Sequence, residues 1–364
     1  MTQEDPQLDH LIDRVRAAQA EGTKLQIQGG NTKAFYGEAP QGEPLDVTAL
    51  TGISSYEPTE LVVTARCGTP LAELEAALAA KGQCLPFEPP RFASGSTVGG
   101  MVAAGLSGPA RASNGAVRDY VLGATLLNGK GEVMSFGGQV MKNVAGYDVS
   151  RLLAGSLGLL GVILEVSLKV LPVPLATATL RFELDEATAI QRLNEWSAQP
   201  LPINASAWWD GTLVLRLRGA QAAVQAAIAR LGGETIDPFH ASRFWEGLRD
   251  QGDEFFQKGL AAVNGGGTLW RLSLPQTAAP VQLSGEQLIE WGGAQRWWVT
   301  ATPAAAVREA ARKAGGHATL FRGKDKSGGV FAPLAPPLDR IHRQLKTAFD
   351  PAGVFNPGRL YPGL

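Results

Sequence analysis

The chain has 364 residues, 45% of them hydrophobic, and is therefore long enough for two or three domains with buried cores. Its formal net charge is −1 and only 18% of its residues are charged, so nothing in the composition indicates nucleic acid or an anionic membrane as a partner. The two cysteines, Cys67 and Cys84, exclude a disulfide framework and a cysteine-rich metal site. Low charge together with 44 glycines favours an enclosed cofactor or large subunit contacts.

The N-terminal segment is polar and amphipathic, and it lacks the apolar core of a secretory signal. The longest apolar run, over 152–164, is too short to span a bilayer. We therefore expect a cytoplasmic protein that associates with a membrane at most peripherally, at its inner face and through a partner.

Apolar residues at helical spacing predict a helix over 8–20, and a short strand then runs into the stretch LQIQGGNTK. A β-rich segment over 61–65 predicts a second strand. The residues after it predict another helix, with Thr69 as its N-cap, Pro70 in its first turn and a stop at Gly82.

Short apolar runs separated by glycine fill 86–172, and the stretch NGKG at 128–131 predicts a hairpin between two of them. The proline-rich segment at 171–174 is typical of a domain exit. Strands and helices then alternate over 176–233 and again over 296–322, which predicts a small α/β domain with an antiparallel sheet.

The segment 236–292 shows no clear pattern, and we expect it to be flexible in part. The Trp297-Trp298 pair alternates across a strand, so we expect one ring in the core and the other exposed. A final helix over 338–349, with Ile341, Leu345 and Phe349 on one face, leads into a tail rich in proline and glycine.

Two glycine-rich stretches have the residue types of phosphate-binding loops. In the first, Gly29 and Gly30 permit positive φ and close approach, so that successive backbone N–H groups form an anion nest; an ordinary turn uses the same residues. In the second, Ser96 and Thr97 precede a Gly-Gly pair at 99–100; close packing of small residues against a sheet is the alternative. Two nests in one chain favour a pyrophosphate. The Gly-x-Gly-x-x-Gly, P-loop and nucleophile-elbow motifs are absent.

Four blocks of sequence, in this order, resemble the FAD-binding domain of the vanillyl-alcohol oxidase and p-cresol methylhydroxylase type. They are GGNTK, SGSTVGGMVAAGLSG, VMKNVAGYDVSRLLAGSLGLLGVILEVSLKVLP and the terminal FDPAGVFNPGRLYPG. The resemblance implies an α+β fold. It implies an FAD-binding domain over 1–174, with subdomains of about 1–90 and 91–174, then a small α/β cap domain over 175–333, and a helix and tail over 334–364 that return to the flavin.

The shortness of the chain, its KNVAGYDVSRLLAGSLG block and its NPGR tail are most similar to the family of E subunits of bacterial glycolate oxidase. This resemblance implies a complex with a larger FAD-binding subunit and an iron–sulfur subunit, in which glycolate, a small 2-hydroxy acid, is oxidised to glyoxylate. Two alternatives stay open. One is a stand-alone FAD-dependent 2-hydroxy-acid dehydrogenase of the D-lactate type, and the other is a structural subunit with a degenerate flavin site.

The resemblance also assigns the flavin contacts, which fall in the two loops, in the small residues after the second loop, in a later turn and in the tail. These residues are Gln28, Gly29, Gly30, Asn31, Thr32, Lys33, Gly95, Ser96, Thr97, Val98, Gly99, Gly100, Ala103, Ser107, Gly161, Val162, Ile163 and Asn356. Relatives that attach FAD covalently use a histidine or cysteine in or beside these loops, and neither loop contains one. We therefore expect noncovalent FAD.

Catalytic residues are harder to assign. The His-x-Gly-Asp-Gly-Asn-x-His motif, in which larger 2-hydroxy-acid dehydrogenases place metal ligands and a base, is absent, so no metal site is expected. His317 and Arg322 remain as candidates, and a surface role explains both equally well. Lys142 and Tyr147 are open candidates for contacts to the flavin pyrimidine, whereas Asp148 is expected to cap a helix over 149–153.

Overall fold

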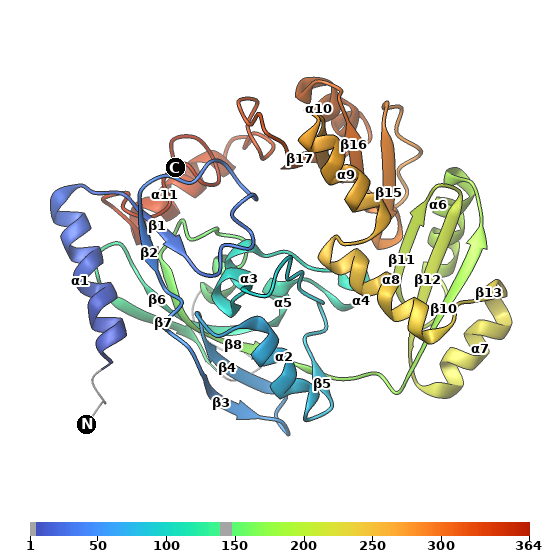
Figure 1. The fold of residues 1–364 in the computed structure, drawn as a ribbon, viewed down its shortest axis with the longest axis horizontal. Coiled ribbons are helices and arrows are strands. Elements are labelled where there is room, and N and C mark those ends of the chain that lie inside the picture. The colour runs from blue at the N-terminus through green and yellow to red at the C-terminus, as the bar shows by residue number, and fades with distance from the viewer. Residues whose placement is uncertain (1–4, 139–147) are drawn as a thin grey trace.

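The computed structural model describes residues 5–138 and 148–364. Lys142 and Tyr147 therefore lie outside the described residues. Figure 1 shows two sheet-containing parts that are joined below by an extended segment following β9 (Leu171–Pro172). The C-terminal helix and tail lie against the first part and not against the second, which precedes them in sequence.

The first part is built around a five-stranded antiparallel sheet of order β3-β4-β8-β6-β7. A two-stranded parallel pair, β1 with β2, lies beside it. Its strands are β1 (Leu25–Gln28), β2 (Glu43–Asp46), β3 (Ile53–Glu57), β4 (Val62–Arg66), β5 (Gln83–Cys84), β6 (Val121–Leu127), β7 (Val133–Gly137) and β8 (Val162–Lys169). Its helices are α1 (Pro6–Glu21), α2 (Leu71–Ala79), α3 (Val98–Ala104), α4 (Arg111–Asn114), α5 (Val117–Tyr120) and the 3-10 helix η1 (Ser150–Leu153).

Local sequence signals explain most of these elements. The Asp5 side chain accepts hydrogen bonds from the first backbone N–H groups of α1, and Gly22 ends the helix at φ 74°. The predicted hairpin forms between β6 and β7, where the Asn128 side chain accepts from the N–H groups of Lys130 and Glu132. The predicted cap of α2 is wrong, because the Thr69 hydroxyl is bonded to the backbone of Gly52.

The second part is an eight-stranded antiparallel sheet of order β13-β10-β12-β11-β15-β16-β14-β17. Its strands are β10 (Ala176–Glu183), β11 (Ile203–Trp209), β12 (Thr212–Gly219), β13 (Glu234–Thr235), β14 (Thr268–Ser273), β15 (Glu286–Glu290), β16 (Gln295–Thr300) and β17 (His317–Arg322). Its helices are α6 (Glu186–Ser197), α7 (Gln221–Leu231), α8 (Pro238–Asp250), α9 (Glu254–Asn264), α10 (Ala304–Lys313) and the 3-10 helix η2 (Trp291–Gly293).

Two sequence predictions for this part are wrong. The segment 236–292, expected to be flexible in part, forms α8, α9, β14 and β15, with Asp237 and Asp253 as helix N-caps. Both Trp297 and Trp298 are buried, at 6% and 2% exposure. The sheet is covered on both faces, because the two rings belong to different hydrophobic clusters.

The C-terminal helix α11 (Leu338–Phe349) is followed by a tail that adds to the edge of β1. Leu25 donates its N–H to the carbonyl oxygen of Val354 at 2.8 Å, and Asn356 donates to the carbonyl oxygen of Leu25 at 2.8 Å. The tail therefore returns to the first part, as predicted. Ile341 on the apolar face of α11 is nevertheless 42% exposed.

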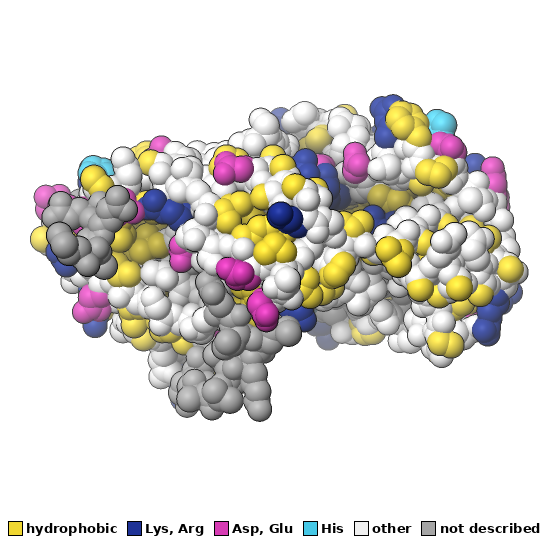
Figure 2. Space-filling view, turned by 90° about the horizontal axis from the view of Figure 1, so that it is seen from below, with side chains coloured by type: hydrophobic (Ala, Val, Ile, Leu, Met, Phe, Trp, Pro, Cys, Tyr) yellow, Lys and Arg dark blue, Asp and Glu magenta, His cyan; other side chains and the backbone are white. Residues whose placement is uncertain are grey.

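The face seen from below carries a group of apolar side chains near its middle (Figure 2). The connection between the two parts contributes to this face, and Leu175 within it is 91% exposed. Within the described part of the chain, no helix has both the length and the apolar character needed to cross a bilayer.

Candidate functional site

A cavity opens in the first part where the loop after β1, the start of α3, the turn before β8 and the C-terminal tail meet. Twelve of the eighteen predicted contact residues line it: Gly29, Gly30, Asn31, Thr32, Lys33, Thr97, Gly99, Gly100, Ala103, Gly161, Ile163 and Asn356. The fold thus brings residues from four distant sequence blocks to one place.

The two glycine loops are in direct backbone contact. A Cβ atom on Gly30 would lie 1.5 Å from the carbonyl oxygen of Gly95, and one on Gly29 would lie 2.6 Å from the Thr97 hydroxyl. Neither Gly29 nor Gly30 has a positive φ; that conformation belongs to Asn31, at 55°. The expected reason for these glycines was therefore wrong in part. They are required because the two loops approach each other closely, and not because their backbone adopts a positive φ.

Lys33 bridges the same two loops. Its ammonium group donates to the hydroxyl of Ser96 at 2.8 Å and to the hydroxyl of Thr32 at 3.3 Å. Burial lowers the pKa of Lys33 to about 8, an effect that the carboxylate of Asp250 partly opposes. The sequence placed Lys33 in the site but gave no indication of this bridge.

The other six predicted residues do not line the cavity. Ser96 is buried under Lys33, and Val98 packs in the hydrophobic core. The Ser107 hydroxyl accepts from the N–H of Val117 and lines a different, smaller pocket. Gln28, Gly95 and Val162 likewise do not line the cavity.

The floor of the cavity is held by Asn356. Its side-chain oxygen accepts from the N–H of Ile27 at 2.8 Å, and its amide nitrogen donates to the carbonyl oxygen of Leu157 at 2.6 Å. This residue therefore joins β1, the turn before β8 and the tail. The turn itself needs Gly161, where a Cβ would lie 2.5 Å from the carbonyl oxygen of Leu127.

Sequence reasoning missed nine lining residues. Most are small or apolar neighbours of predicted ones, and only their place in the fold identifies them: Gln26, Ile27, Ala34, Val47, Cys67, Ala104, Leu157, Gly158 and Arg359. Arg359 donates to the carbonyl oxygen of Ala34 at 2.7 Å, and with Lys33 it gives the wall two cationic side chains. No acidic residue among the described ones lines the cavity, so its charge suits an anionic ligand.

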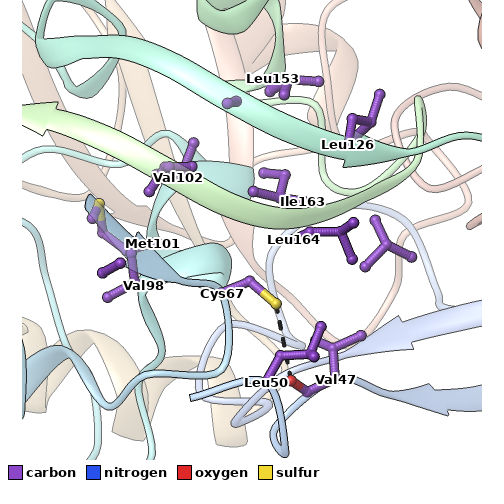
Figure 3. Packing of buried hydrophobic residues seen from close by; sticks show 14 of the residues in the cluster. Val47, Leu50, Cys67, Val98, Met101, Val102, Leu126, Leu153, Ile163 and Leu164 are labelled. Carbon is purple, nitrogen blue, oxygen red and sulfur yellow. Dashed lines mark hydrogen bonds between the residues drawn. The ribbon is translucent and has the colours of Figure 1, made fainter. Parts of the chain in front are cut away.

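Cys67 is the one lining thiol among the described residues. Its sulfur points at the carbonyl oxygen of Val47, 3.9 Å away, between Val47, Leu50 and Leu164 (Figure 3). Burial raises the pKa of this thiol to about 12. Because the thiolate is the nucleophilic form, burial disfavours nucleophilic attack by Cys67.

The two catalytic candidates do not come together. His317 and Arg322 stand at opposite ends of β17, and His317 is exposed. Arg322 lies against the aromatic rings of Phe35 and Phe92, which follow the first loop and precede the second. Asp148 binds the Ser150 hydroxyl at 2.9 Å and the Arg151 guanidinium, and the predicted helix cap is wrong because no side chain caps η1.

Comparison with known proteins identifies the family of the chain. Residues 7–137 match the family model described as an FAD binding domain. The chain is 50% identical over 354 residues to glycolate oxidase subunit GlcE of Escherichia coli (strain K12), an alignment that covers 97% of each protein. The chain belongs to the GlcE family. It is therefore an FAD-binding oxidoreductase subunit, as the sequence blocks predicted.

Two more distant relatives align over less than half of this GlcE-family chain. D-lactate dehydrogenase of Anaerostipes hadrus is 34% identical over 38% of the chain and 29% of that protein. Glycolate oxidase subunit GlcD of Bacillus subtilis (strain 168) is 31% identical over 42% of the chain and 33% of that protein. A solved structure of alkyldihydroxyacetonephosphate synthase has a TM-score of 0.66 at 14% identity, over 96% of this chain and 74% of that one. That likeness confirms the α+β fold class.

Proposed function

We propose that this chain binds FAD noncovalently in the cavity between the two glycine loops and serves in a multi-subunit glycolate oxidase that converts glycolate to glyoxylate. The observation that carries this proposal is the pair of interlocked loops, which leave backbone N–H groups, two hydroxyls and two cations around a cavity whose described lining residues include no carboxylate. Its partners would be a larger FAD-binding subunit and an iron–sulfur subunit, and any membrane attachment would be peripheral and through them.

Each part of the cavity has a role in this proposal. The loop at 29–32 and the loop at 95–100 would hold the pyrophosphate through backbone N–H groups, with Lys33 supplying positive charge. Gly161 and Asn356 would support the flavin from the floor. When bound, FAD supplies an acceptor for the hydride that leaves the α-carbon of a 2-hydroxy acid.

We also propose the division of the chain that the sequence indicates, into an FAD domain over 1–174, a cap domain over 175–333 and a C-terminal segment over 334–364. The strand order supports it. Along the sequence, β8 is the last strand of the five-stranded sheet, and every strand from β10 to β17 belongs to the eight-stranded sheet.

The noncovalent mode follows from the side chains in the cavity wall, where no histidine of the described residues is found and the thiol of Cys67 is engaged with a carbonyl oxygen. Acid precipitation of the purified protein should therefore leave the yellow colour in the supernatant. Flavin that stays with the pellet would contradict this mode of binding.

The decisive experiment is purification of the chain with and without its co-expressed partner subunits. We expect a yellow protein that is inactive alone and that supports glycolate-dependent reduction of a dye when the partners are present. Activity of the isolated yellow chain would favour a stand-alone 2-hydroxy-acid dehydrogenase. A colourless chain that still assembles would show a structural subunit with a degenerate flavin site.

A further inference from the structure

Arg322 is a half-buried cation without a polar partner. Its guanidinium lies 3.4 Å from the centre of the Phe35 ring and 5.6 Å from that of Phe92. It donates no hydrogen bond and forms no ion pair with any residue in 5–138 or 148–364, and its Nε is fully enclosed without an acceptor. Burial lowers the pKa of Arg322 to about 10, and no neighbouring carboxylate opposes the effect.

Other buried arginines in the chain have acceptors. Arg216 binds Glu88 and Asn204, Arg296 binds the carbonyl oxygens of Ala278, Ala279 and Gly293, and Arg359 binds carbonyl oxygens of the first loop segment. A guanidinium carries five N–H donors, and buried donors in native proteins are normally satisfied. In this respect Arg322 differs from Arg216, Arg296 and Arg359, and an anion is the partner that its charge and geometry fit.

Arg322 is connected to the wall of the FAD cavity through two aromatic rings. Phe35 directly follows Ala34, which lines that cavity. The ammonium of Lys33, another lining residue, lies over the Phe92 ring at 5.6 Å from its centre. Phe92 itself has a positive φ of 60°, a strained conformation for a bulky side chain that persists only where the surroundings enforce it. The rings of Phe35, Phe92 and Phe321 pack against each other within 6.3 Å and join both nucleotide loops to β17.

We propose that Arg322 is the receptor for the carboxylate of a small acid beside the FAD cavity, so that this chain carries its own subsite for the 2-hydroxy acid. The inference rests on the proposed function and extends it, because it places a substrate contact in this subunit. Arg322 presents a planar fork that matches both oxygens of a carboxylate, and the Phe35 ring holds the plane of that fork. It belongs to the cap sheet and not to either nucleotide loop, which favours a second ligand over the FAD phosphates.

The neighbouring cation does not compete for this role. Lys324, which follows Arg322 by two residues, donates its ammonium to the carbonyl oxygen of Asn264 at 2.7 Å. Lys33 is engaged with the hydroxyls of Thr32 and Ser96. Arg271, whose guanidinium lies 5.9 Å from the centre of the Phe321 ring, donates to the Tyr36 hydroxyl at 3.0 Å. Among the described residues, Arg322 is thus the cation of this aromatic cluster that has no polar partner.

The test uses the FAD-loaded chain and oxalate, a two-carbon dicarboxylate with no α-hydrogen to lose. Binding is followed by the change in flavin absorbance and in tryptophan emission, since the Trp297 ring meets the Phe321 ring edge to face, with their centres 4.7 Å apart. We expect Arg322→Gln to weaken oxalate binding about 10- to 100-fold, the range for loss of charge-assisted hydrogen bonds. Arg322→Lys keeps the charge but loses the planar fork, so its affinity for oxalate should lie between those of the wild type and Arg322→Gln.

The matched control is Arg312→Gln, because Arg312 is an exposed arginine of the same part that pairs with Glu309 on α10. It should bind oxalate as the wild type does. If Arg322→Gln fails to fold, the oxalate affinity of Arg322→Lys tests the proposal. Unchanged oxalate affinity in both variants overturns the subsite, as does absence of oxalate binding to the wild type; a loss of FAD affinity without a change for oxalate assigns Arg322 to the cofactor instead. In each case FAD content and activity with partner subunits test the proposed function separately.

Discussion

At the scale of single residues, the contact between Gly30 and Gly95 is asymmetric. A Cβ on Gly30 would lie 1.5 Å from the Gly95 carbonyl oxygen, a distance that no side chain can adopt. A Cβ on Gly95 would lie 3.5 Å from the Gly30 carbonyl oxygen, which is ordinary contact. The same pair of loops therefore offers both a disruptive and a tolerated substitution.

We expect Gly30→Ala to separate the loops, to lower the free energy of unfolding by about 2 kcal/mol and to abolish FAD binding. Gly95→Ala should keep FAD at full occupancy. The ratio of flavin to protein absorbance after purification and a urea titration of each variant measure the two effects. Full FAD occupancy in the Gly30 variant would mean that the loops tolerate a wider spacing than the structure has.

The loss of FAD in a glycine variant does not by itself assign the loops to phosphate. A Cβ on Gly30 or Gly99 meets protein atoms, in the second case the Cβ of Cys67 at 2.6 Å, whether or not a phosphate is present. A variant at Lys33 is more informative, because Lys33 lines the cavity and its truncation places no new atom between Gly30 and Gly95.

FAD affinity should depend on pH through Lys33. The pKa of Lys33 is about 8 in the free protein, and a bound pyrophosphate would favour the ammonium form and raise this pKa. The apparent affinity should therefore be constant below pH 8 and fall roughly tenfold for each pH unit above it. The free energy of unfolding of the FAD-free protein should instead rise with pH between 8 and 10.5. In that range the unfolded chain holds a proton that the folded Lys33 has lost.

Fluorescence titrations of FAD at several pH values measure this dependence. Lys33→Met should bind FAD more weakly than the wild type at pH 7 and should lose the pH dependence, because the titrating group is gone. A wild-type affinity that stays constant between pH 7 and 9 would remove Lys33 from the phosphate site.

At the scale of elements, the sequence predicted those structures whose signals are local. The strand into Gly29-Gly30, the N-terminal helix and the hairpin at 128–131 all formed where expected. It failed where a residue is committed to a distant partner. The Thr69 hydroxyl serves Gly52 in place of capping α2. The sequence did place Asn356 in the site, but its hydrogen bond to Ile27, 329 positions away, required the fold.

The missed helices α8 and α9 are a different kind of failure. Asp237 and Asp253 are local N-cap signals, and Ala241, Trp245 and Leu248 recur at helical spacing on the buried face of α8. Aromatic and charged residues on the remaining faces obscured this pattern. For the site, sequence blocks located the loops, but the Lys33 bridge to Ser96 depends on a contact between residues 63 positions apart and required the fold.

The C-terminal helix α11 holds the tail through a buried ion pair. The Lys346 ammonium donates to Asp350 at 2.6 Å and to the carbonyl oxygens of Leu159 and Phe355, each at 2.8 Å. Asp350 also accepts from the backbone N–H groups of Val354 and Phe355. This cluster fixes both the turn before β8 and the segment that carries Asn356 to the cavity floor.

We expect Lys346→Met to lower the free energy of unfolding by about 3 to 5 kcal/mol and to reduce FAD occupancy, because it leaves Asp350, 1% exposed, as an unpaired buried charge. Arg343→Met on the same helix removes a solvent-exposed pair with Asp339 and should cost less than about 1 kcal/mol. Urea denaturation of the two variants compares them. Equal losses would show that the buried pair adds nothing beyond an exposed one.

At the scale of the whole molecule, the two parts meet at a charged junction that is largely excluded from water. Glu88, in the segment after β5, receives hydrogen bonds from Arg216 at 2.7 and 2.8 Å and from Arg218 at 2.7 Å, both on β12. Burial alone would raise the pKa of Glu88, but the two guanidinium groups outweigh it and hold the pKa below its ordinary value. The junction therefore depends on an ionised Glu88.

Replacement of Glu88 by glutamine should loosen the cap sheet from the FAD part. Arg216 is only 2% exposed, so the variant leaves a buried cation without its counter-ion, at a cost of about 3 kcal/mol. We expect one unfolding transition in the wild type and two in Glu88→Gln, and we expect proteases to cut the variant near the exposed Leu175 connection. Glu183→Gln, which removes an exposed pair with Arg181, is the matched control and should keep one transition.

The same junction predicts how the wild type responds to acid. A carboxylate whose pKa is lower in the folded protein contributes stability at neutral pH, and that contribution is lost as pH falls through the folded value, below the ordinary 4.5. The wild type should therefore acquire the split transition of Glu88→Gln only under such acidic conditions, whereas the variant should show it at pH 7 as well. Calorimetry from pH 7 to pH 3 measures both proteins. A wild type that keeps one transition at pH 3, or a variant that keeps one at pH 7, would place the connection between the two parts elsewhere than at Glu88.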